Sequence, residues 1–322
     1  MRAPGFWTAP APTIRARLLS PLGALYGAIT SARMARAGAR VGARVVCIGN
    51  FTLGGAGKTP AALALAERLI AAGERVVFLS RGYGGALSGP SPVIVDPARH
   101  GAGEVGDEPL LLARRAPAVI CADRVAGARA AVDLRASVIV MDDGLQNPAL
   151  AKDDRIAVVD GAVGLGNGLT VPAGPLRAPM SAQWGHVDQV WIVGPGEAGG
   201  RVGEEAARRG KQVGLCRLEP DADVVAALAG RRLLAFAGIG RPSKFFETLR
   251  GAGLNVAATQ VFADHHPYSP GDLAALTRRA TGAGLTLVTT EKDYVRLGPE
   301  LRAMGEAAGL VALPARLIFD PA

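Results

Sequence analysis

The chain has 322 residues, of which 49 % are hydrophobic and 20 % are charged. This length is typical of two domains or one large domain, and the composition excludes an intrinsically disordered chain. The 43 Gly and 22 Pro follow no three-residue period, which excludes a collagen-like chain. The three cysteines, Cys47, Cys121 and Cys216, are far apart and form no CxxC pair, as expected of a protein from a reducing compartment.

The formal net charge of +8 belongs to the N-terminal part of the chain. Residues 1–66 contain eight basic side chains and no acidic one, because the first acid is Glu67. The remaining residues are balanced, with 28 basic against 28 acidic side chains, and no basic stripe interleaved with aromatic residues occurs among them. Binding to nucleic acid is therefore not expected.

An uncharged stretch, 18–32, lies between arginines within this basic segment. Its apolar residues recur at the spacing of one helical face, and they are Leu18, Leu22, Leu25, Tyr26 and Ile29. The stretch is shorter than the roughly 20 residues that a bilayer-spanning helix needs. Flanking arginines suit a helix that lies on an anionic membrane surface, while the alternative is a helix packed on the protein's own core. A signal peptide is not expected, because the next motif needs cytosolic nucleotide.

The next elements are a buried strand, 45–48, the sequence GNFTLGGAGKTP at 49–60, and a helix, 61–72. A strand, a glycine loop that ends in Gly-Lys-Thr and a helix are the context of a P-loop, which binds the phosphates of ATP. Lys58 would reach the β- and γ-phosphates, and the hydroxyl of Thr59 would ligate Mg²⁺. Thr52 stands where the general pattern has glycine. The residues expected to surround the phosphates are Gly54, Gly55, Ala56, Gly57, Lys58 and Thr59.

The following elements predict a doubly wound sheet. A strand at 75–79 completes a βαβ unit, and a helix at 109–115, a strand at 118–121 and a helix at 123–132 follow with short connections. Residues 137–144 form a second buried strand that ends in Asp142 and Asp143. Carboxylates at the carboxyl end of a parallel strand can hold Mg²⁺ beside a P-loop, although such a pair can also be a turn with a helix cap.

The second half of the chain continues the alternation of strands and helices. A Pro/Gly-rich passage, 161–179, interrupts the pattern after a strand at 156–159. The further elements are strands at 190–193, 212–216, 233–237, 256–262 and 285–289, and helices at 243–249 and 272–279. No second Gly-Lys-Thr loop occurs. These elements predict a smaller α/β domain that closes over the first.

Three features of the chain are ambiguous when taken alone. The pair Gly238 and Gly240 could bind an anion at the start of a helix, although a tight turn is favoured. His265 and His266 could ligate a metal, but no third ligand lies at a suitable spacing. Asp107 resembles a helix N-cap, and nothing in its neighbourhood marks it as catalytic.

Taken together, eight segments of the chain resemble the tetraacyldisaccharide 4′-kinase family of Gram-negative lipid A biosynthesis. They are GNFTLGGAGKTP (49–60), SRGYGG (80–85), GDEP (106–109), DDGLQ (142–146), PAGPLR (172–177), GIGRP (238–242), DHHPY (264–268) and TTEKD (289–293). They occur in the family's order, and the family shares Thr52 in its P-loop. The basic, apolar N-terminus matches as well, because this family acts at the cytoplasmic face of the inner membrane.

The resemblance implies transfer of the γ-phosphate of ATP, with Mg²⁺, to the 4′-hydroxyl of a tetraacylated glucosamine disaccharide 1-phosphate, the lipid A precursor. It implies that Asp107 and His265, rather than His266, form an Asp–His pair that takes the hydroxyl proton. Because these two residues lie in different halves of the chain, closure of the domains would assemble the site. The residues that fall where the acceptor would bind are Arg81, Tyr83 and Arg124.

The expected architecture is an α/β fold: a P-loop domain with a doubly wound, mostly parallel sheet, a smaller α/β domain, and an N-terminal amphipathic helix. The expected ranges are 1–40 for the membrane-surface segment, 41–150 for the P-loop domain, 151–295 for the second domain, and 296–322 for a tail that could pack back on the first. Two alternatives stay open from the residues alone: a P-loop kinase or synthetase with a soluble substrate, and a non-enzymatic nucleotide switch. The sequence holds no signal for an oligomeric state.

Overall fold

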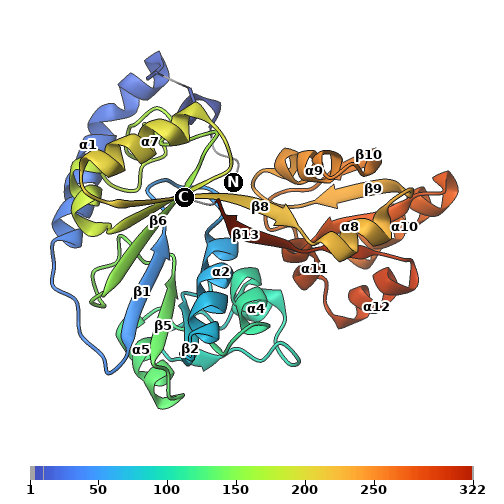
Figure 1. Ribbon diagram of the computed structural model, residues 1–322, viewed down its shortest axis with the longest axis horizontal. Coiled ribbons are helices and arrows are strands. Elements are labelled where there is room, and N and C mark those ends of the chain that lie inside the picture. Colours follow the sequence, from blue (N-terminus) through green and yellow to red (C-terminus); the bar gives the residue numbers. More distant parts are fainter. Residues whose placement is uncertain (1–3, 10, 321–322) are drawn as a thin grey trace.

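The protein consists of two α/β lobes joined by a pair of strands, as seen in the computed structural model (Figure 1), which describes residues 4–9 and 11–320. The larger lobe is built on a nine-stranded sheet with the order β13-β8-β7-β6-β1-β5-β2-β4-β3. The smaller lobe is built on a four-stranded sheet with the order β10-β9-β11-β12. The predicted fold class, a mostly parallel P-loop sheet with a second α/β domain, is confirmed.

The seven central strands of the large sheet are parallel, and the strands at both edges, β3 and β13, are antiparallel to their neighbours. The strands of this sheet are β1 (Arg44–Gly49), β2 (Val76–Ser80), β3 (Val93–Ile94), β4 (Ala118–Ile120), β5 (Val138–Asp142), β6 (Asp154–Asp160), β7 (Gln189–Val193), β8 (Gln212–Pro220) and β13 (Ala315–Phe319). The helices of this lobe are α1 (Ile14–Met34), α2 (Lys58–Ala71), α3 (Ala102–Val105), α4 (Asp107–Ala113), α5 (Arg124–Asp133), α6 (Met180–Gln183) and α7 (Glu197–Arg208), with 3-10 turns at Gly5–Trp7 and Trp184–His186.

The small sheet is parallel throughout. Its strands are β9 (Arg232–Ala237), β10 (Asn255–Val261), β11 (Thr286–Thr290) and β12 (Val311–Leu313). The helices of the smaller lobe are α8 (Ala222–Leu228), α9 (Pro242–Gly251), α10 (Pro270–Ala283), α11 (Glu291–Arg296) and α12 (Pro299–Ala307). Parallel strands must be linked by crossovers, and these helices supply them on both faces of the sheet.

The two sheets divide the chain differently from the expected ranges. Strands β6, β7 and β8, which fall in the range expected for the second domain, belong to the large sheet, so the division at residue 150 is wrong. The smaller lobe begins only after β8, at about α8. Strand β13, from the range expected to be a tail, pairs with β8 and returns the chain to the large sheet.

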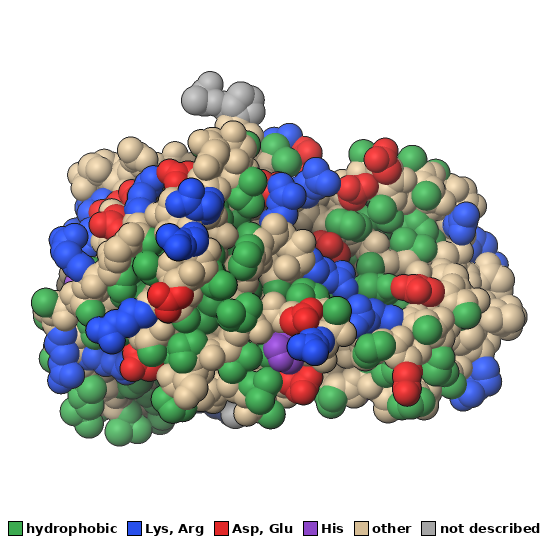
Figure 2. Space-filling view, turned by 90° about the horizontal axis from the view of Figure 1, so that it is seen from below, with side chains coloured by type: hydrophobic (Ala, Val, Ile, Leu, Met, Phe, Trp, Pro, Cys, Tyr) green, Lys and Arg blue, Asp and Glu red, His purple; other side chains and the backbone are tan. Residues whose placement is uncertain are grey.

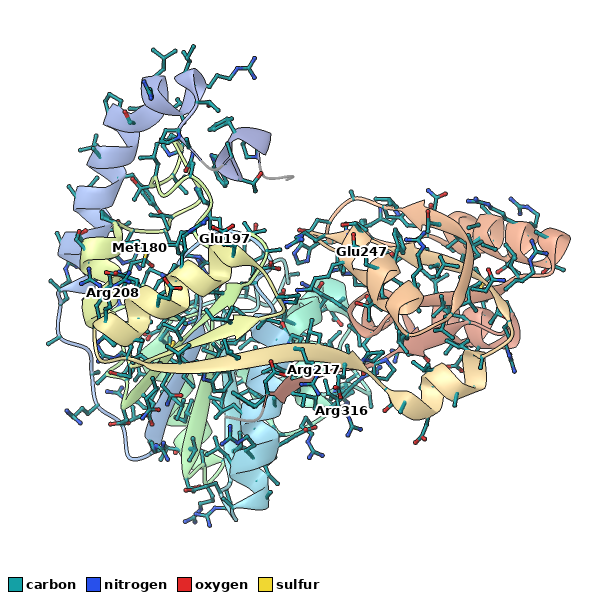
Figure 3. All side chains as sticks on the ribbon, turned by 45° about the horizontal axis from the view of Figure 1, so that its top comes forward. Met180, Glu197, Arg208, Arg217, Glu247 and Arg316 are labelled. Carbon is teal, nitrogen blue, oxygen red and sulfur yellow. The ribbon has the colours of Figure 1, made fainter. Side chains whose placement is uncertain are left out.

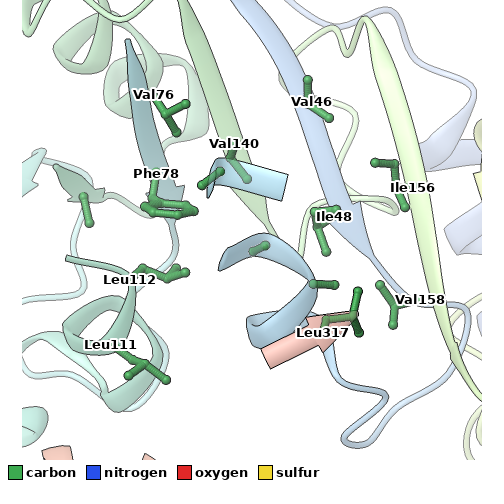
Figure 4. Close-up of a cluster of buried hydrophobic side chains, with 14 of the residues drawn as sticks. Val46, Ile48, Val76, Phe78, Leu111, Leu112, Val140, Ile156, Val158 and Leu317 are labelled. Carbon is green, nitrogen blue, oxygen red and sulfur yellow. The ribbon is translucent and has the colours of Figure 1, made fainter. Parts of the chain in front are cut away.

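The large sheet has apolar side chains on both faces, as strands covered by helices on both sides do. Along β1, Val46 and Ile48 point into one cluster, while Val45 and Cys47 point into the other. Figure 4 shows the first cluster, in which Ile48 lies among side chains from β5, β6, α2 and the returning strand β13. This double packing fixes β1 in the middle of the sheet, with β5 and β6 on its two sides.

Helix α1 packs on the larger lobe through its small residues. A Cβ on Gly23 would lie 2.9 Å from the carbonyl oxygen of Thr170, and one on Gly27 would lie 2.9 Å from Cγ of Pro179, so only glycine allows this approach. The opposite face is apolar and points outward, with its members Ile14, Leu18, Leu22, Leu25 and Ile29 exposed. The helix passes through Pro21 and is longer than the predicted stretch.

Strands β8 and β13 form the connection between the lobes. They pair in antiparallel register from Cys216 opposite Phe319 to Pro220 opposite Ala315, and each continues into the smaller lobe. Figure 3 shows Arg217 and Arg316 along this long ribbon, with the two lobes on either side of it. The chain therefore crosses between the lobes along a single two-stranded ribbon.

Candidate active site

The glycine loop after β1 has the geometry of a phosphate-binding loop. Gly54 has φ 121° and Gly57, the N-cap of α2, has φ 92°, a left-handed region that side chains with a Cβ rarely adopt. Helix α2 starts at Lys58, earlier than the predicted residue 61, so the Gly-Lys-Thr sequence lies at the helix N-terminus. Nζ of Lys58 lies 3.3 Å from Oδ1 of Asn50 and 3.7 Å from Oδ2 of Asp143. The positive end of α2 and Lys58 thus face the same carboxyl end of the sheet.

The Pro/Gly-rich passage that the sequence marked as a break supports the start of this loop. The N–H of Leu53 donates to the carbonyl oxygen of Pro175 at 2.7 Å, and the N–H of Arg177 donates to that of Phe51 at 2.9 Å. Nε of Arg177 donates to the carbonyl oxygen of Thr52 at 3.0 Å. Thr52 is therefore held in an extended bridge by the PAGPLR segment, a role that does not require glycine.

The two aspartates at the end of β5 have different surroundings. Asp143 has φ 53° and receives a hydrogen bond from Nη2 of Arg177 at 2.9 Å, while Lys58 lies on its other side. These two cations lower the pKa of Asp143 against the effect of its burial. Asp142 is buried, and its Oδ1 has no hydrogen-bond partner. Burial, with the charges of Glu108 and Asp143 in addition, raises the pKa of Asp142 to about 7.

An orphaned, buried carboxylate oxygen beside a P-loop fits a Mg²⁺ site. A cation there would offset the cost of desolvating the Asp142 carboxylate, which raises its pKa. Within the described residues, no three His, Cys, Asp or Glu side chains cluster as a metal site. Mg²⁺ beside a nucleotide needs fewer protein ligands, since it keeps several waters and binds phosphate oxygens. A single carboxylate together with the Thr59 hydroxyl is a sufficient set of protein ligands.

Asp107 and His265, which are 158 residues apart, meet where the lobes face each other. Oδ2 of Asp107 lies 3.1 Å from Nδ1 of His265. Asp107 is not the helix N-cap that its local sequence suggests: Gly106 is the cap, and Asp107 is the first residue of α4 with its side chain turned to the other lobe. His265 has φ 57°, a conformation that brings its ring back towards α4. The GDEP and DHHPY segments thus contact one another.

Two cations of α11 surround the Asp107 carboxylate. Nε of Arg296 donates to Oδ2 of Asp107 at 2.7 Å, and Nζ of Lys292 lies 3.8 Å from the same oxygen and 2.5 Å from Oε1 of Glu108. The hydrogen bond with His265 and the two cations hold the pKa of Asp107 well below its usual range, although its burial opposes this. The hydrogen bond with Asp107 raises the pKa of His265.

His266 points away from this pair. Its ring stacks on Phe262, with the ring centroids 4.7 Å apart, and its Nε2 lies 3.1 Å from Oδ2 of Asp272. Asp272 also closes the capping box of α10 with Ser269. His266 therefore stabilises the start of α10 within the smaller lobe.

Of the three residues expected to contact an acceptor, two are open to solvent. Tyr83 is 72 % exposed, and its ring centroid lies 6.4 Å from that of His265. Arg81 is exposed two residues before it. Arg124 is buried, and its Nη1 donates to the carbonyl oxygen of Cys121 at 2.8 Å. Burial lowers the pKa of Arg124, and the nearby charge of Asp142 opposes that shift.

Backbone packing brings the SRGYGG loop to the dyad. Gly106 has φ 89°, and a Cβ there would lie 2.8 Å from the carbonyl oxygen of Tyr83. Seen from below, the middle of the molecule shows a histidine among acidic and basic side chains where the lobes meet (Figure 2). The site is therefore a charged surface shared by both lobes.

Several side chains of this site were not singled out by sequence analysis. They are Asn50, Glu108, Arg177, Lys292 and Arg296. Four of them lie inside motifs that were recognised as segments, so their motif was a usable signal. Arg296 follows TTEKD by three residues and no motif marks it. Its importance depends on contacts with residues distant in the sequence.

A glycine loop, its lysine, an aspartate at the end of the adjacent strand and an Asp–His pair across from them define a P-loop phosphotransferase. The family model described as tetraacyldisaccharide-1-P 4'-kinase matches residues 15–322. The chain belongs to this family. The soluble-substrate kinase and the nucleotide switch that the residues alone left open are therefore set aside.

Curated relatives that carry the name tetraacyldisaccharide 4'-kinase extend over the same length. The protein of Methylobacterium nodulans is 58 % identical over 320 residues, which are 99 % of this chain and 92 % of that protein. The protein of Rhodopseudomonas palustris strain BisB18 is 55 % identical over 322 residues, which are 100 % of this chain and 93 % of that protein. The crystal structure of "apo" form LpxK from Aquifex aeolicus in complex with ATP has a TM-score of 0.71 at 24 % identity, covers 96 % of each chain and shows the same fold.

The N-terminal helix bears on where such an enzyme acts. Among residues 4–9 and 11–320, no helix combines the length and the apolar character that crossing a membrane requires. The exposed face of α1 nevertheless carries large apolar side chains from Ile14 to Ile29.

Proposed function

We propose that this chain carries out the reaction of its family with the residues described above. The chain is an ATP-dependent kinase that phosphorylates the 4′-hydroxyl of a tetraacyldisaccharide 1-phosphate, a lipid A precursor. Family membership over the full length supports this activity. The single structural observation that supports the roles of individual residues is the contact between Asp107 and His265 where the two lobes meet.

The nucleotide would bind at the start of α2. The backbone N–H groups of residues 54–59 would surround its phosphates, and Lys58 would leave Asn50 and Asp143 to contact the β- and γ-phosphates. Thr59 and Asp142 would hold Mg²⁺, which when bound offsets the negative charge on the phosphate oxygens. The separate environments of the two aspartates support this division. Asp143, bound to Arg177, would position Lys58 rather than the metal.

His265 is proposed as the base that takes the proton of the 4′-hydroxyl. With Nδ1 donating to Asp107, Nε2 keeps its lone pair and can accept that proton as the hydroxyl oxygen attacks phosphorus. The lowered pKa of Asp107 keeps it ionised, so it orients the imidazole and stabilises the imidazolium without becoming protonated itself. A general base of this kind contributes about 10²–10⁴-fold to the rate.

The acceptor is proposed to lie beside the SRGYGG loop. Arg81 and Tyr83 are exposed, and Tyr83 is next to His265, so both could contact the sugar and its 1-phosphate. Arg124 is buried, and it interacts electrostatically with Asp142. Its position therefore favours stabilisation of the Asp142 charge over direct contact with a bulky lipid.

The exposed face of α1 is proposed to lie on an anionic membrane surface, at the cytoplasmic face of the bacterial inner membrane. The alternative is a helix that only packs on the protein's own core; the membrane orientation is favoured by the leucines, which face out while the glycines face the protein. An acylated acceptor stays in the membrane, so a kinase for it must work at that surface. Arginines near the ends of the apolar face, Arg15, Arg17 and Arg33, would face anionic headgroups.

The activity is tested by incubating purified protein with γ-³²P-labelled ATP, Mg²⁺ and tetraacyldisaccharide 1-phosphate. We expect label in a bisphosphorylated lipid, resistant to chemistry that releases the 1-phosphate. Label at the 1-position of the lipid would contradict the proposal. So would label found only in inorganic phosphate released by hydrolysis of ATP.

The dyad is tested by kcat with both substrates saturating. His265→Ala and Asp107→Ala should each lower kcat by about 10²–10⁴-fold, and the double variant should be scarcely slower than the worse single one, because the two residues act as a unit. His266→Ala is the matched control and should be much milder. Multiplicative losses in the double variant, or a severe defect in His266→Ala alone, would refute the assignment.

A further inference from the structure

We infer that Arg296 is a positioning residue of this reaction: from the smaller lobe, its guanidinium holds both Asp107 and the backbone of His265 in the geometry that proton transfer needs. This inference rests on the proposed role of the Asp107–His265 dyad. Nothing in the sequence pattern around Arg296 marks it. Its side chain is 4 % exposed, so it is too buried to contact a substrate.

One edge of the guanidinium is aligned with Asp107. Nε donates to Oδ2 of Asp107 at 2.7 Å, and Nη2 lies 2.5 Å from the same oxygen in an ion pair, without a hydrogen bond of its own. That oxygen is the one that contacts Nδ1 of His265. Arg296 therefore determines where the carboxylate stands when it orients the imidazole.

The other edge of the guanidinium reaches the main chain that supports His265. Nη1 of Arg296 donates to the carbonyl oxygen of Gly238 at 2.5 Å. The N–H of His265 donates to that same oxygen at 3.0 Å. His265 has φ 57°, which for a histidine is a strained conformation, and this shared carbonyl is one of the contacts that keep it there.

Asp293 fixes the guanidinium itself. Its Oδ1 receives Nη1 of Arg296 at 2.8 Å, the N–H of Gly238 at 2.9 Å and the hydroxyl of Tyr268 at 2.9 Å. Asp293 has no exposed surface. Because the carboxylate is held by these donors, Arg296 cannot move without breaking several enclosed hydrogen bonds.

The fork shape of the side chain matters as well as its charge. A lysine ammonium is a single point and cannot reach Asp107 and the Gly238 carbonyl at once, so Arg296→Lys would keep the charge and lose the alignment. Misplacement of a catalytic pair by about 1 Å can cost about 10²-fold in rate. Arg296→Gln, which loses the charge too, should also change the titration of the dyad.

The sign of that change follows from the charged groups around the pair. The His265 ring faces Asp107, Asp264 and Lys292, and Asp107 in turn faces Lys292 and Arg296, which also pair with Glu108 and Asp293 respectively. Removing one cation from this set favours the protonated ring. Only the neutral ring accepts a proton, so the acid limb of kcat should move to higher pH in Arg296→Gln and stay near the wild-type position in Arg296→Lys.

The experiment measures kcat and the KM of each substrate from pH 5.5 to 9 in the full-length enzyme and in both variants. In both variants we expect kcat at neutral pH to fall by about 10- to 10²-fold and the KM for ATP to stay within about twofold. In Arg296→Gln we also expect the acid limb of the kcat profile to shift to higher pH. Arg155→Gln is the matched control, because Arg155 also pairs with an aspartate through its guanidinium, donating to the two oxygens of Asp188 at 2.7 and 2.9 Å, away from the dyad. Its kcat and acid limb should stay unchanged.

A second measurement covers the case in which Arg296→Gln folds poorly. Nitrogen-15 NMR of the four histidines in wild type and Arg296→Lys reports the tautomer of His265, which should be protonated at Nδ1 in the wild type and mixed in the variant. An unchanged tautomer together with wild-type kcat in Arg296→Lys overturns the inference. The inference is also overturned if kcat of Arg296→Gln falls by the same factor at every pH and the fraction of folded protein falls equally. Full activity of His265→Ala would refute the dyad instead, whatever Arg296 does.

Discussion

The exposed apolar face of α1 makes a quantitative prediction about membrane binding. Leu18 is 76 % exposed and Leu25 is 61 % exposed, and both lie on the face opposite the glycines that contact the lobe. Leu→Ala removes three carbons, worth about 0.8 kcal/mol each when buried in an apolar phase. Scaled by exposure, the two substitutions should weaken transfer into the membrane by about 1.8 and 1.5 kcal/mol, and the double variant should bind vesicles more than about 10²-fold more weakly.

The assay is sedimentation with sucrose-loaded vesicles that contain phosphatidylglycerol. Alanine keeps the helix, and the two leucines make few contacts with the lobe, so the melting temperature should hardly change. Leu215→Ala is the control, because Leu215 is 56 % exposed on β8, away from α1. Deletion of residues 1–40 would be a poorer test, since it also removes Trp7 and Met34, which are buried in the fold.

Wild-type sedimentation of the double variant would refute the proposed orientation of α1. Equal losses in Leu215→Ala would refute it as well, because binding would then not be specific to this helix. Raised salt should weaken binding of wild type and double variant alike, since the arginines beside the face contribute about 1 kcal/mol each near an anionic surface.

Three further predictions concern the active site. Lys58→Ala should lower phosphoryl transfer by about 10²-fold or more at saturating ATP, because the phosphate charge loses its main side-chain partner; wild-type turnover would mean that the loop does not act as a P-loop. Calorimetric affinity for Mg²⁺ and ATP together should fall as the pH is lowered through about 7, the pKa to which burial raises Asp142, because the protonated carboxyl cannot bind the metal. Asp142→Asn should remove this dependence, and its persistence in that variant would place the metal elsewhere. The acid limb of wild-type kcat should lie above pH 6.5, the ordinary value of histidine, because Asp107 raises the pKa of His265 and only the neutral ring accepts a proton; a limb below 6.5 would contradict this role.

Sequence was most informative where function depends on a short, continuous segment. The glycine loop before a helix could be predicted because the strand, the glycines and Lys58 are adjacent. The position of Asp142 at the carboxyl end of β5 could be predicted because residues 137–144 have the pattern of a buried strand. The apolar face of α1 was visible as a helical repeat. Its orientation was not, since that depends on how closely Gly23 and Gly27 approach the lobe.

Features set by distant contacts could not be predicted in this way. Asp107 has the local pattern of an N-cap, but its partners lie 158 and 189 residues away in His265 and Arg296, and these contacts outweigh the local preference. Helix α7 was missed because its glycines lower helix propensity. It forms because Gly199 fits against Gly161, where a Cβ would come within 2.5 Å of the main chain. The domain boundary predicted at residue 150 was wrong because β6 pairs with β1 in the large sheet, and the sequence of neither strand alone specifies its partner.

The pairing of β13 with β8 sets an order on how the molecule can be assembled during synthesis. Arg217 and Asp320 are bridged across 103 positions of the chain, and the whole smaller lobe lies between them. While a ribosome is making that lobe, the outer edge of β8 has no strand beside it, and such an edge invites pairing with other chains. The nucleotide-binding sheet thus acquires its last strand only after the lobe that holds His265 and Arg296 has been made.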